Sequence, residues 1–308
     1  MNAHSDGLTE LLAISGVRGV LGAHIEAGSD WGWWSAASAG AAFHAVTSGT
    51  AWLAVEGGEP LQLLPGDVLL LPRGTAHTLG SDPAAVAPKR RDAIEHGERG
   101  VVRIGSGPTR THILCAHYVY DTAASTQVLP ALPDIVHIPT ERGGGMDDTI
   151  RLVARELTEP RLATSVVLDH LVEILLVQLL RAWLDAHELP GQLGALRDPI
   201  VGAAMSLIHG DPARAWTADT LAREVNVSRA TLARRFVERT GETPAGYLTR
   251  WRMDLAAKRL RETGDALEAI AQAVGYTSVF AFSRAFRRTR GEPPGRYRAR
   301  PRHERAVG

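Results

Sequence analysis

The sequence contains a single cysteine, Cys115, which excludes an internal disulfide framework and a zinc site built from several cysteines. Long apolar runs are also absent, since the longest, Ile174 to Leu180, is interrupted by Gln178 and is too short to cross a bilayer. The first twelve residues lack the basic and apolar segments of a secretory signal. We therefore expect a cytoplasmic protein that has no membrane partner.

Sequence features of enzymes are equally scarce. No nucleophile elbow, phosphate-binding glycine loop or paired-carboxylate motif stands out along the chain. The run Gly143-Gly144-Gly145 lacks the lysine and the helix context of a phosphate-binding loop. The sequence therefore predicts a protein that binds other molecules without catalysis.

Charge is present but unevenly distributed. The 308 residues are a length typical of two domains, and their formal net charge is zero. Residues 1–200 carry 14 basic and 23 acidic side chains, whereas residues 201–308 carry 20 basic and 11 acidic ones. This asymmetry favours a C-terminal domain that binds nucleic acid, joined to a domain of another kind.

The first 120 residues are rich in patterns typical of short β-strands. Residues 41–56 and residues 62–71 each predict two strands around a turn, and residues 111–120 alternate like a half-buried strand. Residues 81–100, which are rich in Pro, Ala and charge, predict an exposed loop. Short strands at this spacing indicate a sandwich or a small barrel, which we place at about residues 1–140.

The hydrophobic period changes to that of a helix after Asp147. Residues 147–187 predict two helices broken near Pro160. Residues 189–199 contain several Gly and Pro residues, which is typical of a domain boundary. The first domain is therefore expected at residues 1–190. The aliphatic stripe Val166–Trp183 either caps the barrel or is buried against a second subunit, and we expect a homodimer.

The basic part contains an internal repeat with an offset of 50 residues. The motif GETPAGY at residues 241–247 returns as GEPPGRY at residues 291–297, and Phe236 returns as Phe286. Each copy predicts a helix-turn-helix. The predicted helix caps are Thr217, Ser228 and Ser278, and the predicted turn residues are Asn226 and Gly275.

The second helix of each copy is expected to face DNA. Small or arginine side chains on its outer face suit the major groove, although a plain helical bundle with solvated arginines is the alternative. The predicted DNA-facing residues are Arg229, Ala230, Ala233 and Arg234 in the first copy and Val279, Phe280, Ser283 and Arg284 in the second. The arginines expected to contact phosphates are Arg235, Arg239, Arg287 and Arg288.

With these motifs, residues from about 198 to 302 resemble the AraC/XylS family of bacterial transcription regulators. The strongest match is AVGYTSVFAFSRAFRRTRGEPPGRYR at residues 273–298. The resemblance implies an all-α double helix-turn-helix that binds double-stranded DNA, with one helix at about residues 247–262 bridging the two units. It also implies RNA polymerase as a partner if the protein is an activator. Thr289-Arg290 departs from the family pattern, which usually has an aromatic residue before the glycine.

The first domain resembles the cupin-type sensor domain found upstream of such DNA-binding segments. The resemblance rests on residues 43–46, 49–53, the Pro-Gly-Asp turn at 65–67, and residues 70–74 and 77–79. It implies a β-barrel with an inner pocket for a small-molecule effector. The whole chain is thus expected to be α+β, with a cupin-like barrel and a helical hairpin followed by an all-α domain.

The candidate effector-pocket residues are His44, His77, Cys115 and His117. His112 also lies near a predicted strand and could face the same pocket, and the tryptophans at 31, 33 and 34 are expected in a surface loop or at the rim of a pocket. Metal-binding cupins usually place two histidines one residue apart, whereas His44 stands alone in its segment. The sequence therefore predicts no metal and no cofactor.

Two alternatives to an effector-responsive regulator remain open. One is a metal-dependent cupin enzyme fused to a DNA-binding domain. The other is a regulator that responds to oxidation of Cys115, whose thiol would be activated by a neighbouring histidine or by Arg110. A metal assay distinguishes the first alternative, and alkylation of the thiol distinguishes the second.

Overall fold

The computed structural model describes residues 7–86, 92, 94–96, 100–120, 128–139, 145–159, 161–187 and 191–299. The chain divides into two compact units. We call Val17–Tyr120 together with Leu132–His187 the barrel unit. The helical unit consists of Met1–Gly16, Asp121–Ala131 and Glu188–Gly308. The presence of one sheet-rich unit and one all-helical unit confirms the predicted α+β class.

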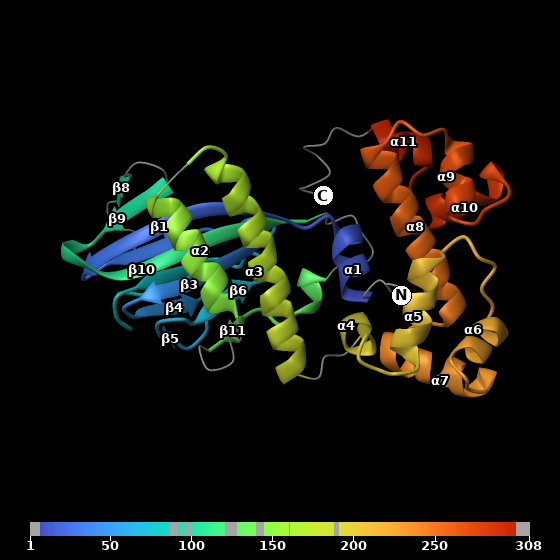
Figure 1. Cartoon of the computed structure of the whole chain (residues 1–308), viewed down its shortest axis with the longest axis horizontal. Helices are drawn as coiled ribbons and strands as arrows, with labels where there is room; N and C mark the ends of the chain where they lie inside the picture. Colours follow the sequence, from blue (N-terminus) through green and yellow to red (C-terminus); the bar gives the residue numbers. More distant parts are fainter. Residues whose placement is uncertain are drawn as a thin grey trace. The chain divides into compact units, whose positions relative to one another are not determined.

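The barrel unit is built from two sheets (Figure 1). The seven-stranded sheet has the order β11 (Val136–Ile138), β6 (Val68–Leu71), β3 (Ala41–Ser48), β10 (Ser106–Val119), β1 (Arg18–Ser29), β9 (Val101–Ile104) and β8 (Ile94–His96). The four-stranded sheet has the order β2 (Gly32–Ser35), β7 (His77–Gly80), β4 (Ala51–Val55) and β5 (Leu61–Leu63). Side chains from both sheets form one buried core that includes Ile25, Leu53, Leu69 and Ile113.

The two predicted strand turns are confirmed. Gly49 joins β3 to β4 with a φ of 71°, and a Cβ added there would lie 2.2 Å from the carbonyl oxygen of Arg110, so this turn requires glycine. Between β5 and β6, the carboxylate of Asp67 accepts a hydrogen bond from the backbone N–H of Leu64 at 3.0 Å. This bond closes the Pro-Gly-Asp turn.

Two helices, α2 (Met146–Thr158) and α3 (Thr164–Ala186), cover one face of the larger sheet (Figure 1). Leu175 and Leu179 of α3 are fully buried. The hydroxyl of Tyr118 on β10 donates to the carbonyl oxygen of Val172 at 2.7 Å, which fixes the helix to the sheet. The predicted helical pair is therefore confirmed, while the predicted break at Pro160 lies outside the described residues.

The helical unit contains the predicted repeat as two helix-turn-helix pairs joined by a long helix (Figure 1). Its helices are α5 (Val201–Gly210), α6 (Ala218–Glu224), α7 (Arg229–Thr240), α8 (Pro244–Glu262), α9 (Leu267–Ala273), α10 (Val279–Arg290) and α11 (Pro294–Ala299). The pairs are α6–α7 and α9–α10. The bridging helix α8 begins three residues earlier than expected, because Thr243 caps it and Pro244 suits its first turn.

The predicted caps and turns of the repeat are confirmed. The hydroxyls of Thr217, Ser228 and Ser278 accept hydrogen bonds from the third residue of their helices. Asn226 adopts a left-handed conformation with a φ of 55°, and Gly275 adopts one with a φ of 79°. Each helix-turn-helix is thus specified by short-range hydrogen bonds and backbone conformation.

The inner faces of α7 and α10 are buried in the core of the helical unit. Leu232 and Phe236 of α7 are fully buried, as are Phe282 and Phe286 of α10. Phe286 packs edge-to-face on Tyr297, with ring centroids 5.3 Å apart. The opposite faces of α7 and α10 are therefore directed away from the core.

Arg290, the departure from the family pattern, is buried in an ion pair with Asp254 of α8. The Arg290 side chain is 4% exposed and that of Asp254 is 0% exposed. Arg250, one turn before Asp254 on α8, also binds this carboxylate at 3.4 Å. An ionic contact between α10 and α8 therefore occurs where the family resemblance implies an aromatic side chain.

Two short helices contradict the sequence predictions. The N-terminal residues were expected to be β structure in the first domain, but α1 (Gly7–Ser15) belongs to the helical unit, where it packs against α5 and α8. Leu11 of α1 is buried, and the Lys258 ammonium donates to the carbonyl oxygen of Ala13 at 2.9 Å. A nine-residue helix is too short to show a clear period, which explains the error.

The second short helix is α4 (Gly191–Ala195), which lies in the segment predicted as a linker and packs against α7. Its Leu193 is buried. A third difference concerns residues 81–100, where β8 replaces part of the expected loop. Residues 87–91, 93 and 97–99 of that loop lie outside the described residues. A short 3-10 helix, η2 (Leu129–Ala131), completes the elements. Among the helices described here, none is long and apolar enough to span a membrane.

Candidate functional site

The predicted DNA-facing residues lie on the outer faces of α7 and α10. On α7, Arg229, Ala230 and Arg234 are exposed and Ala233 is partly exposed. On α10, Phe280 is 84% exposed, Arg284 is exposed, and Val279 and Ser283 are partly exposed. Each set therefore forms one accessible face, and Arg234 and Arg284 occupy equivalent positions on the two helices.

Arg229 and Arg234 form ion pairs on the surface of the helical unit. Arg234 donates to Glu238 at 2.8 Å, one turn further along the helix, and Arg229 donates to Asp219 of α6 at 3.4 Å. Exposed pairs of this kind contribute about 0–1 kcal/mol. The two guanidinium groups are therefore free to exchange these carboxylates for a stronger partner.

Two of the arginines expected to contact phosphates instead have a structural role. Arg235 and Arg239 of α7 donate to the carboxylate of Asp198, at 2.8 Å and 3.2 Å. The Asp198 side chain is 2% exposed and also accepts the backbone N–H groups of Ile200 and Val201, both at 3.0 Å. Burial opposes ionisation of this carboxylate, but the hydrogen bonds from Val201 and Arg235 outweigh burial and lower the pKa of Asp198.

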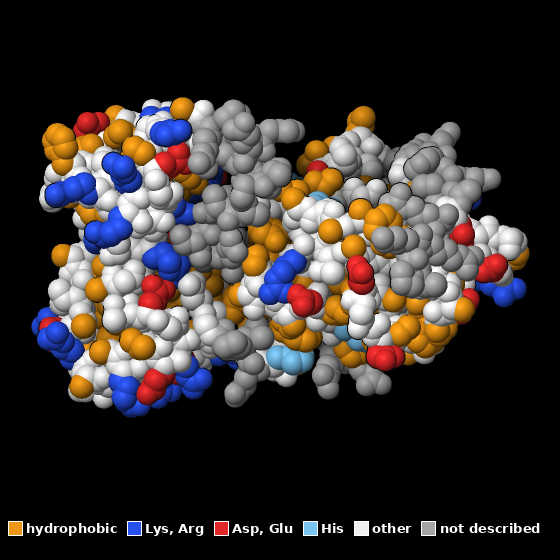
Figure 2. All heavy atoms as spheres, turned by 180° about the vertical axis from the view of Figure 1, so that it is seen from behind, with side chains coloured by type: hydrophobic (Ala, Val, Ile, Leu, Met, Phe, Trp, Pro, Cys, Tyr) orange, Lys and Arg blue, Asp and Glu red, His pale blue; other side chains and the backbone are white. Residues whose placement is uncertain are grey.

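Arg287 and Arg288, the other two expected phosphate contacts, are exposed in the last turns of α10. Figure 2 shows Lys and Arg side chains spread over one face of the helical unit. Arg287 and Arg288 are therefore available to a polyanion, whereas the Nε groups of Arg235 and Arg239 are engaged by the buried Asp198. No sequence pattern could have separated these pairs, because Asp198 lies 37 residues before Arg235.

The barrel unit contains a cavity of about 330 Å³. All four predicted pocket residues, His44, His77, Cys115 and His117, line it. The rest of the lining is mostly apolar. These other lining residues are Gly22, Ala23, Ile25, Trp33, Ser35, Ala36, Ser38, Ala42, Leu79 and Ala116.

Two of the wider pocket expectations need correction. His112 does not line the cavity, because side chains alternate along β10 and those of Ile113 and Cys115 point inward. Trp33 lines the cavity, but Trp31 is fully buried in the barrel core and is not a surface-loop residue.

A chain of hydrogen bonds fixes the protons at the polar end of the cavity. The Thr75 carbonyl oxygen only accepts, so the Nδ1 of His77 donates to it at 2.8 Å. In a neutral ring the Nε2 of His77 then accepts, and the Nε2 of His44 donates to it at 2.9 Å. The Nδ1 of His44 is left to accept from the Cys115 thiol at 3.1 Å. One arrangement of protons therefore satisfies all three side chains.

Burial keeps the hydrogen-bonded side chains of His77, His44 and Cys115 uncharged. Burial lowers the pKa of His44 well below its usual range, and the neighbouring His77 lowers it further. Burial also lowers the pKa of His77. For the same reason the pKa of the Cys115 thiol rises to about 12. At neutral pH the polar end of the cavity therefore presents neutral imidazoles and a protonated thiol.

A second group of potential ligands lies outside the cavity and was missed by the sequence analysis. His24, Glu26 and His112 each place a ligand atom within 4.8 Å of the other two. The group combines one residue pair on β1 with a residue on β10 that is distant in sequence. The alternation His-Ile-Glu on a strand was the one local signal for it.

Comparison with known proteins assigns both units to families. The cupin family matches residues 6–185, and the helix-turn-helix domain family matches residues 221–300. A putative AraC-like transcription regulator of Streptomyces lividans is 38% identical over 301 residues, covering 96% of this chain and 99% of that protein. A regulator of the same description from Streptomyces antibioticus is 36% identical with the same coverage.

Among solved structures, the chain is similar to the DNA-binding domain of AdpA, which was crystallised in complex with a target DNA. The identity is 29%, the match covers 36% of this chain and 98% of that domain, and the TM-score is 0.33. The full-length relatives and the two family matches establish what the fold and the exposed arginines indicated. This chain belongs to the AraC-like family of DNA-binding transcription regulators and combines a cupin domain with a C-terminal helix-turn-helix domain.

Proposed function

We propose that this regulator works in the cytoplasm, binds two adjacent major grooves of an operator through α7 and α10, and responds to a small molecule in the barrel cavity. The observation that carries the proposal is the placement of two equivalent exposed arginine faces on either side of one bridging helix. The helix α8 has 19 residues and is therefore about 28 Å long. Successive major grooves on one side of DNA are about 34 Å apart, so the lengths are compatible.

Arg234 is the best candidate for a base contact. It lies between the inward Leu232 and Phe236 on the outer face of α7, with Ala230 and Ala233 beside it. Small neighbours let the helix approach the bases closely, and arginine can bond both O6 and N7 of guanine. On α10 the exposed Phe280 accompanies Arg284, which suits a thymine methyl group or an anchoring contact.

Arg287 and Arg288 are proposed to contact phosphates. Both are exposed and follow Arg284 by three and four residues, so they lie on the same side of α10 but nearer its C-terminal end. Phosphate contacts position the protein and make affinity depend on salt, but they carry no sequence information. We assign no phosphate role to Arg235 and Arg239, because Asp198 already binds both.

The lining of the cavity indicates the class of effector. A volume of about 330 Å³ is at the small end for ligand pockets. The apolar walls and the uncharged end formed by His44, His77 and Cys115 provide no ion pair for a charged ligand. We therefore propose a small, largely apolar, uncharged molecule that carries a single hydrogen-bonding group.

The two alternative mechanisms receive less support from this geometry. A metal-dependent cupin enzyme would need ring nitrogens directed at an ion, whereas those of His44 are engaged by His77 and Cys115. A redox-responsive thiol reacts as a thiolate, whereas burial raises the pKa of Cys115 to about 12. We therefore propose that the regulator acts by binding, without catalysis and without oxidation of this thiol.

We also propose a homodimer formed by the outer face of α3. Most of the predicted stripe, including Leu175 and Trp183, is buried within the chain and is not available to a partner. Val166 and Val167 remain exposed on α3, and so does Ile174 about two turns further along the helix. Apolar patches on a surface helix often mark an interface, and two-fold dimers are the commonest oligomers.

The base-reading role is tested with single-arginine variants, after genome-wide mapping of binding sites has defined an operator. Arg234→Ala should lose about 1–3 kcal/mol of discrimination between operator and scrambled DNA, because a bidentate base contact is removed. The loss should exceed that of Arg284→Ala. Arg287→Ala or Arg288→Ala should weaken binding to both DNAs alike and lower the salt slope by about one unit.

The measurement is a titration of each full-length variant against both DNAs at several salt concentrations. Arg151→Ala, which removes an exposed arginine of α2 in the barrel unit, is the matched control and should leave both affinities unchanged. Equal losses on operator and scrambled DNA for Arg234→Ala would show that this arginine contacts only phosphate.

The effector cavity is tested with a variant that fills it. A panel of small uncharged alcohols and phenols is screened for compounds that raise the melting temperature of the full chain and change operator affinity. Ala42→Phe should abolish both effects, because Ala42 lines the cavity. Ala54→Phe on β4, which does not line the cavity, should retain both effects. A compound that acts equally on Ala42→Phe would place the effector elsewhere.

The dimer is tested by placing charge on α3. Val166→Glu combined with Ile174→Glu should convert a dimer into a monomer, as measured by analytical ultracentrifugation at micromolar concentration. Leu64→Glu, which changes an equally exposed apolar residue in the β5–β6 turn, should leave the dimer intact. A monomeric mass for the unmodified chain, with and without operator DNA, would refute the proposal.

A further inference from the structure

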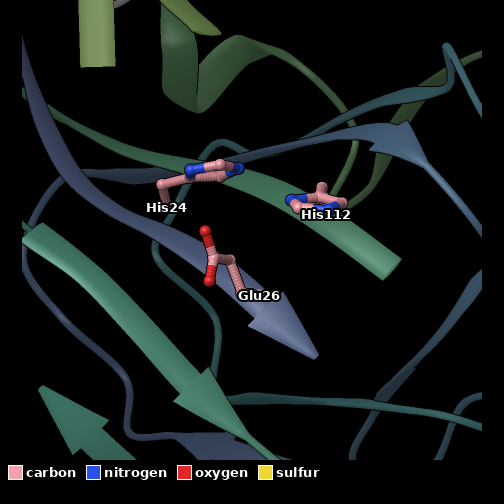
Figure 3. Close-up of side chains that lie close together, drawn as sticks. All are labelled: His24, Glu26 and His112. Atoms are coloured by element: carbon pink, nitrogen blue, oxygen red, sulfur yellow. The ribbon is translucent and has the colours of Figure 1, made fainter. Parts of the chain in front are cut away.

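Three potential metal ligands gather on the face of the larger sheet opposite the cavity. His24 and Glu26 are two residues apart on β1, and His112 is the register partner of Glu26 on β10. One ligand atom from each lies within 4.8 Å of the other two. Figure 3 shows the three side chains close together over these neighbouring strands.

The strand period places all three on one face. Ile25, between His24 and Glu26, points into the barrel core, and Ile113, next to His112, does the same. Because successive side chains of a strand alternate, the two histidines and the glutamate share the outer face. Register partners of an antiparallel pair are close enough for their side chains to interact.

The imidazole rings of both histidines are available for coordination. His24 is 6% exposed, and its ring stacks on that of His112 with centroids 5.4 Å apart. Among the described residues, no hydrogen bond engages a ring nitrogen of either histidine.

One positive charge opposes an ion at this position. The Nε of Arg103 on β9 donates to Oε2 of Glu26 at 2.9 Å. The Arg103 side chain is more than half exposed, so this ion pair is weak and the guanidinium can move away. Glu26 also has a second carboxylate oxygen.

We propose that His24, Glu26 and His112 bind one divalent transition-metal ion, for which zinc is the best match. Two imidazoles and one carboxylate are a ligand set that zinc uses, with further positions left to water. Ligand atoms of a tetrahedral zinc site are about 3.4 Å apart, so the three side chains need to close by little more than 1 Å.

The site is independent of the effector cavity but shares two strands with it. Ile25 of β1 and Cys115 of β10 line the cavity from the inner face of the same sheet. An ion held by β1 and β10 cross-links these strands, and a ligand that binds only the folded state stabilises it. Zinc is therefore expected to raise the melting temperature of the barrel unit.

The full-length protein is first treated with a chelator, and its affinity for Zn²⁺ is measured in competition with a chromophoric chelator. The visible spectrum of the Co²⁺ form is recorded as a second measurement. The unmodified protein should bind one ion per chain. His24→Gln, Glu26→Gln and His112→Gln should each weaken binding at least tenfold and remove the zinc-dependent rise in melting temperature. Arg103→Gln should tighten binding by about threefold, because a repelling charge is removed.

Two controls make the result specific to this site. His170→Gln, which changes an exposed histidine beside Glu173 on α3, should bind zinc like the unmodified protein. Far-UV circular dichroism shows that each variant is folded. Failure of the unmodified protein to bind zinc would overturn the proposal. So would binding that survives all three site variants and is lost in His44→Gln, because the ion would then lie in the cavity.

Discussion

The packing of the helical unit depends on the buried carboxylate of Asp254. This carboxylate binds Arg290 at the end of α10 and Arg250 on its own helix, and Arg250 in turn binds Glu242 at 2.8 Å, just beyond the end of α7. Consecutive ionic contacts thus join α10 to α8, and α8 to the end of α7. Removing one partner from such a buried pair costs about 3–5 kcal/mol, because the remaining charge stays buried.

This ionic chain also explains how the protein tolerates its departure from the family pattern. An aromatic residue before the glycine would contribute apolar packing, whereas Arg290 contributes a directed contact to a fixed point on α8. A directed contact restrains the orientation of α10 as well as its distance. The outer faces of α7 and α10, including Arg234 and Arg284, are therefore held at a fixed separation.

In the barrel unit, the corresponding constraint is the alternation of side chains along β1 and β10. One face of these strands contributes Ile25 and Cys115 to the cavity, and the other face contributes His24, Glu26 and His112 to the proposed zinc site. Two sites with different chemistry thus share one pair of strands. The cavity side is kept uncharged by burial, while Glu26 gives the outer side a negative charge partly balanced by Arg103.

The features that could be predicted from sequence are local. The caps Ser228 and Ser278 and the left-handed Asn226 were identified because each involves residues a few positions apart. The pocket histidines His44 and His77 were found through their strand positions and a family resemblance. Contacts between distant segments were missed, because nothing near Arg235 indicates Asp198 and nothing near His24 indicates His112. The N-terminal helix was missed because its burial depends on α5 and α8.

The central claim, that α8 holds α7 and α10 at a fixed separation, is tested most directly by changing the spacing of the operator. Each base pair inserted between the two contacted blocks moves them apart by about 3.4 Å and rotates one relative to the other. Affinity of the full-length protein is measured by fluorescence anisotropy for insertions of one to five base pairs. We predict that an insertion of two or more base pairs weakens binding as much as scrambling one block. Affinity that is unchanged across the series would show that the two helices are not held at a fixed separation.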